Sequence, residues 1–372
     1  MARKTTPKNS ASKNAASDKA ASDGAASKNA TSKNAASSEA TSKHAASKDI
    51  VIGSAHSTAP GVAKGVLKIG EAPDGSTLDI PVIIVRGEKD GPTLWLNGCV
   101  HGNEYCGTYI IHEFLRRLDQ AKLAGTVIAL PILNKPAFQM KQRMSPYEVF
   151  HGGDLNRQFP GDPNGTQTQQ MAHAIYEPLK RHADVLIDFH TAMTPDVRWA
   201  LFPKAGGQVG ALSETVARAF GYRSTLPAPT DILVGSAMMT AAQDGIASYI
   251  VECGGKNRAF TDDAVSDAVE RLRNVLRALN MLEGAVTDHG PLTYFSNFDW
   301  VTASQGGLFE RSVRCGDRIE KGSVIGRYYD AYGNGRGEAK APNAGIVLAI
   351  HSGPVMAVGE TLIHIGLDPR EV

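Results

Sequence analysis

The stretch ADVLIDFHT, residues 183–191, decides the fold of this chain. Its apolar residues follow one another without polar alternation, which is typical of a parallel strand that is buried on both faces. Three further runs have the same character, at residues 93–99 (TLWLNGC), 125–134 (GTVIALPILN) and 246–255 (IASYIVECGG). Two more strands are predicted before them by the Val- and Ile-rich residues 65–70 and 78–87.

Helical patterns lie between these runs. Residues 103–118 have apolar side chains at helical spacing, and their last turn carries Arg116 and Arg117, which suit the negative pole of a helix. Strands that alternate with helices predict an α/β domain with a mixed, largely parallel sheet flanked by helices. The other predicted helices cover residues 167–182, 213–220 and 262–282.

The end of the chain differs from this domain. Residues 287–372 have short strands, glycines and turns, with two half-repeats, GGLFERSVRCGDRIEKGSVIG and APNAGIVLAIHSGPVMAVGETLIHIG. They predict a small all-β, barrel-sandwich-like domain that is similar to biotinyl and lipoyl carrier domains, in which a lysine sits at a hairpin tip. Here the tip carries YGNGRG, and Lys340 lies too close to the second half-repeat. We therefore expect the domain to shape or shield an active site.

The beginning of the chain is of low complexity. A pattern [A/T]-S-x-x-A recurs seven times between residues 11 and 45, and the apolar groups there are limited to alanine side chains and threonine methyl groups. Such a sequence cannot bury enough apolar surface to offset chain entropy. We predict a disordered tail over residues 1–49, whose removal leaves turnover unchanged, and a catalytic domain over residues 50–286.

Composition excludes several classes of function. The chain has 372 residues and a formal net charge of +1, which implies neither nucleic-acid nor membrane binding. It has no apolar run of about 18 residues that would predict a membrane span. Its four cysteines lack CxxC spacing, which favours a reducing compartment, the cytoplasm, over a disulfide framework. Oligomeric state is left open, a homo-oligomer included.

Polar residues follow three of the predicted strands. The first runs into His101 and Glu104, the second ends at His190 and the third at Glu252. In open α/β sheets, ligands bind beyond the carboxyl ends of strands. A histidine at a strand end is often only a turn residue, and HxxE alone is a weak signal. All four residues at such positions together predict a site.

The chemistry of these residues fits a metal. A catalytic zinc site uses three nitrogen and oxygen ligands and keeps one position open, so His101, Glu104 and His190 predict one Zn²⁺ per subunit. Other divalent metals accept the same ligands. A second carboxylate is needed to take a proton from the attacking water, and Glu252 is placed for that role.

A second cluster lies in GGDLNRQFPG, residues 152–161. Arg157 and Asn156 offer a guanidinium fork and an amide donor for a substrate carboxylate. Arg143, upstream, is a candidate to stabilise an oxyanion. Asp154 is a candidate to hydrogen-bond a metal-bound histidine.

The motifs HGNE, DLNRQFPG, DFHT and ECGG, in this order, resemble the succinylglutamate desuccinylase and aspartoacylase family, which is related to zinc carboxypeptidases. The resemblance implies His101, Glu104 and His190 as zinc ligands and Glu252 as general base. It also implies Asn156 and Arg157 at the substrate carboxylate, with Arg143 at the scissile carbonyl and Asp154 behind a zinc histidine.

We therefore predict a zinc-dependent amidohydrolase of small N-acyl amino acids. Two alternatives remain at this point: a zinc carboxypeptidase acting on peptide C-termini, and a non-catalytic metal- or ligand-binding protein. The sequence does not choose the acyl group or the amino acid.

Overall fold

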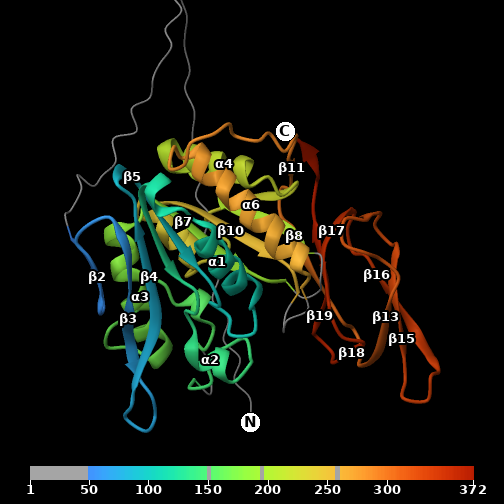
Figure 1. The fold of residues 1–372 in the computed structure, drawn as a ribbon. Helices are drawn as coiled ribbons and strands as arrows, with labels where there is room; N and C mark the ends of the chain where they lie inside the picture. Colours follow the sequence, from blue (N-terminus) through green and yellow to red (C-terminus); the bar gives the residue numbers. More distant parts are fainter. Residues whose placement is uncertain (1–48, 149–151, 193–196, 256–259) are drawn as a thin grey trace, which may run out of the picture. The chain divides into compact units, whose positions relative to one another are not determined.

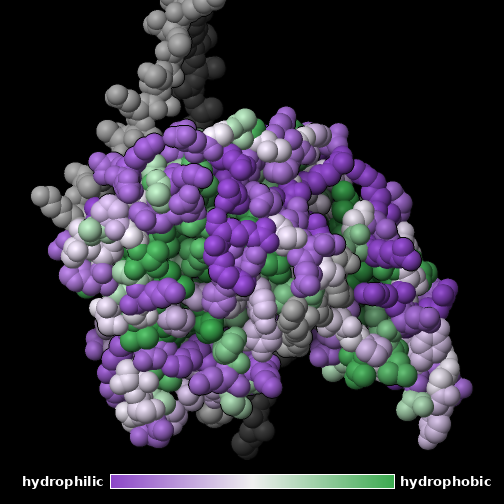
Figure 2. All heavy atoms as spheres, viewed as in Figure 1, coloured by the Kyte–Doolittle hydropathy of each residue, from purple (hydrophilic) through white to green (hydrophobic). Residues whose placement is uncertain are grey.

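The computed structural model describes residues 49–148, 152–192, 197–255 and 260–372. The predicted tail, apart from Asp49, lies outside these residues. Within the described part, no helix is long and apolar enough to cross a membrane. The face drawn in Figure 2 is mostly hydrophilic, with hydrophobic residues in smaller areas between the polar ones.

The main sheet has ten strands in the order β20-β11-β9-β8-β10-β7-β5-β6-β4-β3. Its centre is parallel, because β5, β7 and β10 run in the same direction, whereas β3, β4, β8 and β20 pair antiparallel to neighbours. The predicted mixed sheet is confirmed. The strands are β3 (Gly61–Glu71), β4 (Thr77–Arg86), β5 (Lys89–Asn97), β6 (Ala124–Leu130), β7 (Val185–His190), β8 (Arg198–Pro203), β9 (Ser224–Ala228), β10 (Ala247–Cys253), β11 (Thr293–Tyr294) and β20 (Arg370–Glu371).

Helices cover both faces of this sheet (Figure 1). The apolar faces of α1, α4 and α6 form one core, and α3 and α5 contribute to the other. The helices are α1 (Cys106–Arg117), α2 (Lys135–Gln139), α3 (Gln167–His182), α4 (Gly207–Phe220), α5 (Ala237–Gln243) and α6 (Asp262–Ala278), with short 3-10 turns η1 (Gln120–Lys122) and η2 (Leu155–Arg157).

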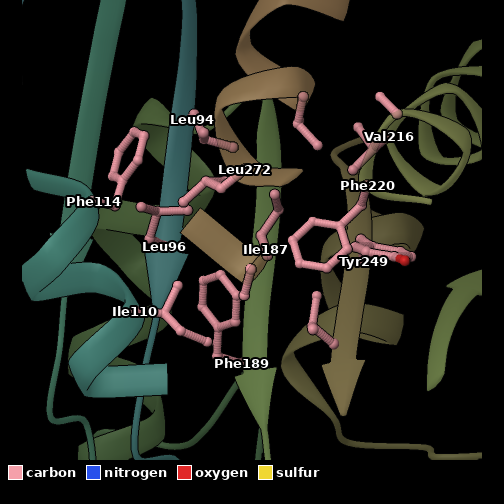
Figure 3. Packing of buried hydrophobic residues seen from close by; sticks show 14 of the residues in the cluster. Leu94, Leu96, Ile110, Phe114, Ile187, Phe189, Val216, Phe220, Tyr249 and Leu272 are labelled. Atoms are coloured by element: carbon pink, nitrogen blue, oxygen red, sulfur yellow. The ribbon is translucent and has the colours of Figure 1, made fainter. Parts of the chain in front are cut away.

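Alternating residues of the central strands enter the two cores. Leu94 and Leu96 pack in the first core, among the residues shown in Figure 3, whereas Trp95 between them packs in the second. On β7, Ile187 belongs to the first core and Leu186 to the second. The unbroken apolar runs of the sequence therefore reflect burial on both faces, as predicted.

The C-terminal part forms two four-stranded antiparallel sheets, with the orders β12-β19-β17-β14 and β16-β15-β13-β18. The glycine-rich stretch, residues 332–337, begins at the hairpin tip between β15 and β16, as predicted, and continues into β16. β11 and β20 flank this part and pair with each other in the main sheet. The strands are β12 (Phe298–Thr302), β13 (Gly307–Arg311), β14 (Arg318–Ile319), β15 (Val324–Tyr329), β16 (Gly335–Lys340), β17 (Gly345–Ile350), β18 (Val355–Met356) and β19 (Thr361–Gly366); β1 (Ile50–Ile52) and β2 (Ala55–Ser57) form a separate pair.

A shared apolar cluster joins the C-terminal sheet to the main sheet. Trp199 and Leu201 of β8 pack in it with Ile250 of β10, and Leu348 and Ala349 of β17 enter from the C-terminal side. This packing brings the sheet containing β12 and β19 close to the strand ends that carry the polar residues.

Candidate metal centre

The turn after β5 places His101 and Glu104. It is compact because glycines allow close approach: a Cβ on Gly102 would lie 2.1 Å from the Ala137 carbonyl carbon. A Cβ on Gly107 would lie 2.4 Å from the Phe189 Cβ, so the start of α1 rests directly on β7. Gly102 therefore lets the turn approach α2, and Gly107 lets α1 approach β7, the strand that ends at His190.

Three potential metal ligands converge at the carboxyl ends of β5 and β7. His101, Glu104 and His190 each offer a ligand atom, and these atoms lie within 4.8 Å of one another. The Nδ1 atom of His101 is 3.0 Å from Glu104 Oε1, and the Nδ1 atom of His190 is 3.1 Å from Glu104 Oε2. All three residues are buried, at 2–3% exposure. Two nitrogens and a carboxylate in such an arrangement fit a divalent metal ion.

A carboxylate lies behind each histidine. The Nε2 atom of His101 is 3.0 Å from Asp154 Oδ1, and the Nε2 atom of His190 is 3.2 Å from Asp188 Oδ2. A metal-bound histidine commonly donates its second nitrogen to such a carboxylate, and His101 with Asp154 has this arrangement. The Asp188 oxygens have no hydrogen-bond partner among the described residues, so Asp188 is an ion-pair neighbour of His190. The Nδ1 atoms of both histidines face Glu104 and therefore the metal position.

Asp188 was missed by the sequence reasoning. A signal was present, because a carboxylate two residues before a strand-end histidine projects from the same face of the strand. Asp188 is 0% exposed within an otherwise apolar strand. Burying an unpaired carboxylate costs free energy. The single carboxylate in the run VLIDFH therefore indicates a partner such as His190.

Arg143 and Asp154 extend this network. Arg143 Nη1 donates to Glu104 Oε1 at 3.0 Å, and its Nη2 lies 3.4 Å from Asp154 Oδ2. Burial alone would raise the pKa of Asp154, but the hydrogen bond and charge of His101 and the charges of Arg143 and Arg157 hold this pKa well below its usual value. The carboxylate is therefore ionised, as a partner for a metal-bound histidine must be.

The DLNR turn positions Asn156 and Arg157. Asp154 caps it by accepting a hydrogen bond from the Asn156 backbone NH at 3.0 Å. The Asn156 side chain is held between two groups, because its Oδ1 accepts from the Ala237 NH at 3.0 Å and its Nδ2 lies 3.2 Å from His190 Nε2. Arg157 Nη1 donates a hydrogen bond to the Asn156 carbonyl oxygen at 2.7 Å. Both side chains line the cavity described below.

Glu252 lies opposite His190. The two residues are register partners on the parallel strands β10 and β7. Burial raises the pKa of Glu252 to about 7, against the lowering effect of the His190 charge. A carboxyl group with that pKa can both accept and return a proton near neutral pH.

These groups share one cavity of about 330 Å³. Of the predicted site residues, all but Asp154 line it, and Asp154 contacts His101 behind it. The other side of the cavity comes from β8 and the C-terminal sheet. The sequence led us to expect the C-terminal domain to shape or shield an active site, but it identified none of the residues there. That side is lined by Trp199, Leu201, Phe298, Trp300, His351, Glu360, Thr361 and His364.

The fold and the site define a class: an α/β protein with a candidate metal cluster at the carboxyl ends of central parallel strands. Residues 90–279 match the model of the succinylglutamate desuccinylase/aspartoacylase catalytic domain. The chain belongs to this family, as its motifs predicted.

Similar proteins span nearly the whole described chain. The N-alpha-acetyl-L-2,4-diaminobutyric acid deacetylase of Halomonas elongata is 31% identical over 324 residues, which are 82% of this chain and 92% of the relative. The product-bound ectoine utilization protein EutE (DoeB) of Ruegeria pomeroyi has a TM-score of 0.74 at 26% identity, covering 83% of this chain and 96% of the other. A succinylglutamate desuccinylase/aspartoacylase structure from Rhodobacter sphaeroides has a TM-score of 0.70 at 27% identity, covering 84% and 95%.

Proposed function

We propose that this chain is a zinc-dependent hydrolase that cleaves the amide bond of small N-acyl amino acids. The observation that carries the proposal is the cavity itself, which contains a metal-ligand cluster, a separate carboxylate and two arginines. The name of the Halomonas relative, a deacetylase of an N-acetyl amino acid, supports the same reaction.

The residues divide into a metal-holding and a reacting set. His101, Glu104 and His190 would hold Zn²⁺, which supplies a Lewis acid that polarises a carbonyl and acidifies a water molecule. Glu252 takes a proton from the attacking water and returns it to the leaving amine. Because Glu252 is not part of the ligand cluster, it is available for both steps.

The arginines serve the substrate. Arg157, beside Asn156, offers its remaining guanidinium donors to a carboxylate of the substrate. Arg143 lies against Glu104, within reach of charge that develops at the metal position. Asp154 keeps His101 oriented and pairs with Arg143, so it acts through these two residues.

The size of the cavity favours this function over a carboxypeptidase. Its volume of about 330 Å³ is near the lower end of small-molecule sites, and the C-terminal sheet forms one side of it. Such a volume suits an N-acyl amino acid better than a peptide. A non-catalytic binding protein would not need Glu252 beside the ligand cluster. The four free cysteines support a reducing compartment, for which we propose the cytoplasm.

The test asks which bond is cut. Zinc-loaded protein is incubated with N-acetyl amino acids and with N-blocked dipeptides, and released amines are followed by mass spectrometry, with a chelator-treated sample as control. We expect deacylation of the single amino acids alone, and only with metal. Release of C-terminal residues from the dipeptides would establish the carboxypeptidase instead.

A further inference from the structure

Thr191 links the strand that ends at His190 to the strand that carries Glu252. The parallel ladder between β7 and β10 ends with the pair of His190 and Glu252. Thr191, the next residue of the chain, is 1% exposed. Its backbone NH donates to Glu104 Oε2 at 3.0 Å, and its hydroxyl donates to the Cys253 carbonyl oxygen at 3.1 Å. One residue therefore contacts a candidate metal ligand through its backbone and the end of β10 through its side chain.

The strand β10 ends one residue after Glu252, at Cys253. The next residue, Gly254, has a φ of +66°, a conformation that favours glycine. A Cβ on Gly254 would lie 3.0 Å from Cys106 Sγ, so the chain turns away from the strand in a packed space. The hydrogen bond from the Thr191 hydroxyl therefore reaches the last strand residue before this turn.

The carboxylate of Glu252 has no anchor of its own. Among the described residues, its side chain forms no hydrogen bond or ion pair with a neighbour. Its place in the cavity is therefore set by the backbone of β10. One edge of that backbone is held by β8, where Trp199 and Arg198 pair with Glu252 and Cys253. On the edge that faces β7, the Thr191 hydroxyl bonds the strand past the last ladder pair.

We propose that Thr191 is a positioning residue, whose hydroxyl holds the end of β10 so that the Glu252 carboxylate faces the reacting water. This inference rests on the proposed function. A general base must lie within hydrogen-bond reach of the proton that it takes, and a displacement of about 1 Å can cost about 100-fold in rate. The side chain suits this task because the backbone NH of Thr191 is already used by Glu104.

The test removes the hydroxyl and keeps the shape of the side chain. Thr191→Val retains the backbone NH that donates to Glu104, so zinc affinity, measured in competition with a chelating dye, should stay within about twofold. For the N-acetyl amino acid that the wild type cleaves fastest, we expect kcat to fall about five- to tenfold, the usual contribution of a neutral hydrogen bond. KM should change by less than about twofold. Thr191→Ser retains the hydroxyl and should keep most of the wild-type kcat.

The matched control is Thr225→Val on β9. Thr225 is 0% exposed, its hydroxyl donates to the Tyr222 carbonyl oxygen at 2.7 Å, and it does not line the cavity. This variant should lower the midpoint of thermal unfolding about as much as Thr191→Val, but kcat and KM should not change. An equal fall of kcat in both valine variants, a serine variant no better than Thr191→Val, or a loss of zinc affinity in Thr191→Val would overturn the inference. If Thr191→Val does not fold, Thr191→Ala against Thr191→Ser makes the same comparison.

Failure of the proposed function is recognised separately, because the wild type would then cleave no N-acetyl amino acid. In that event, crystal structures of the wild type, Thr191→Val and Thr191→Ser decide the inference. We expect the Glu252 carboxylate to be displaced or spread over several positions in Thr191→Val and to keep its place in Thr191→Ser. An undisturbed carboxylate in Thr191→Val overturns the positioning role.

Discussion

The two sides of the cavity are built differently. On the main-sheet side, His101, Glu104 and His190 are at 2–3% exposure, and each is held by several polar contacts. On the C-terminal side, Trp300 is 53% exposed and contacts the rings of His364 and Phe298. We propose from this difference that the main-sheet side carries the reacting groups and the C-terminal side contributes to substrate selection.

The largest effect is expected at Glu252. Glu252→Gln removes the proton acceptor while preserving size, and it should lower kcat by between about 10²- and 10⁴-fold, the usual contribution of general acid–base catalysis. Zinc content, measured by mass spectrometry of the desalted protein, should remain unchanged because Glu252 is outside the ligand cluster. Full activity of the variant would refute its role, and loss of zinc would make it a ligand instead.

The pH dependence tests the same side of the cavity. A general base works only when deprotonated, so kcat/KM should fall about tenfold per pH unit below the pKa of Glu252. Burial raises that pKa to about 7, and a bound dication would lower it, which places the acid limb at or below about 7. Profiles of the wild type and Glu252→Asp should both show this limb. A wild-type rate that is flat from pH 5 to 8 would contradict the assignment.

A smaller loss is expected at Asp188. Replacing a carboxylate behind a metal-bound histidine costs about 10- to 100-fold in metal affinity or activity. Asp188→Asn keeps the shape but removes the charge 3.2 Å from His190 Nε2, so zinc affinity should fall by that amount in competition with a chelating dye. The control is Asp263→Asn at an exposed position in the first turn of α6, which should bind zinc like the wild type. Unchanged affinity of Asp188→Asn would show that Asp188 does not support zinc binding by His190.

The main-sheet side could be predicted from the sequence because its signals are local. Long apolar runs identify strands, their ends share one edge of a parallel sheet, and His190 and Glu252 follow directly. Two strands of the main sheet, β8 and β9, were not predicted in this way. β8 has only four apolar residues, WALF, between Arg198 and Pro203, and β9 contains Pro227, which argues against a strand.

The C-terminal side could not be predicted in the same way. Trp300 and His364 look like ordinary outward-facing strand residues, and they meet only through the register of β12 with β19. Their approach to the cavity depends on how β17 packs against β8 in a cluster that includes Leu348 and Trp199. Such packing between distant segments leaves no periodic trace in the chain.

The smallest effect is expected at Trp300, on the C-terminal side of the cavity. Trp300→Ala removes the exposed ring but no group near the metal cluster, so KM for an N-acyl amino acid substrate should rise about three- to fivefold while kcat stays within about twofold. Trp300→Phe keeps an aromatic face and should lose less. Thermal unfolding of both variants controls for packing against His364. If kcat fell instead while KM held, the C-terminal sheet would take part in positioning the reacting bond, and the division between a reacting and a selecting side would not hold.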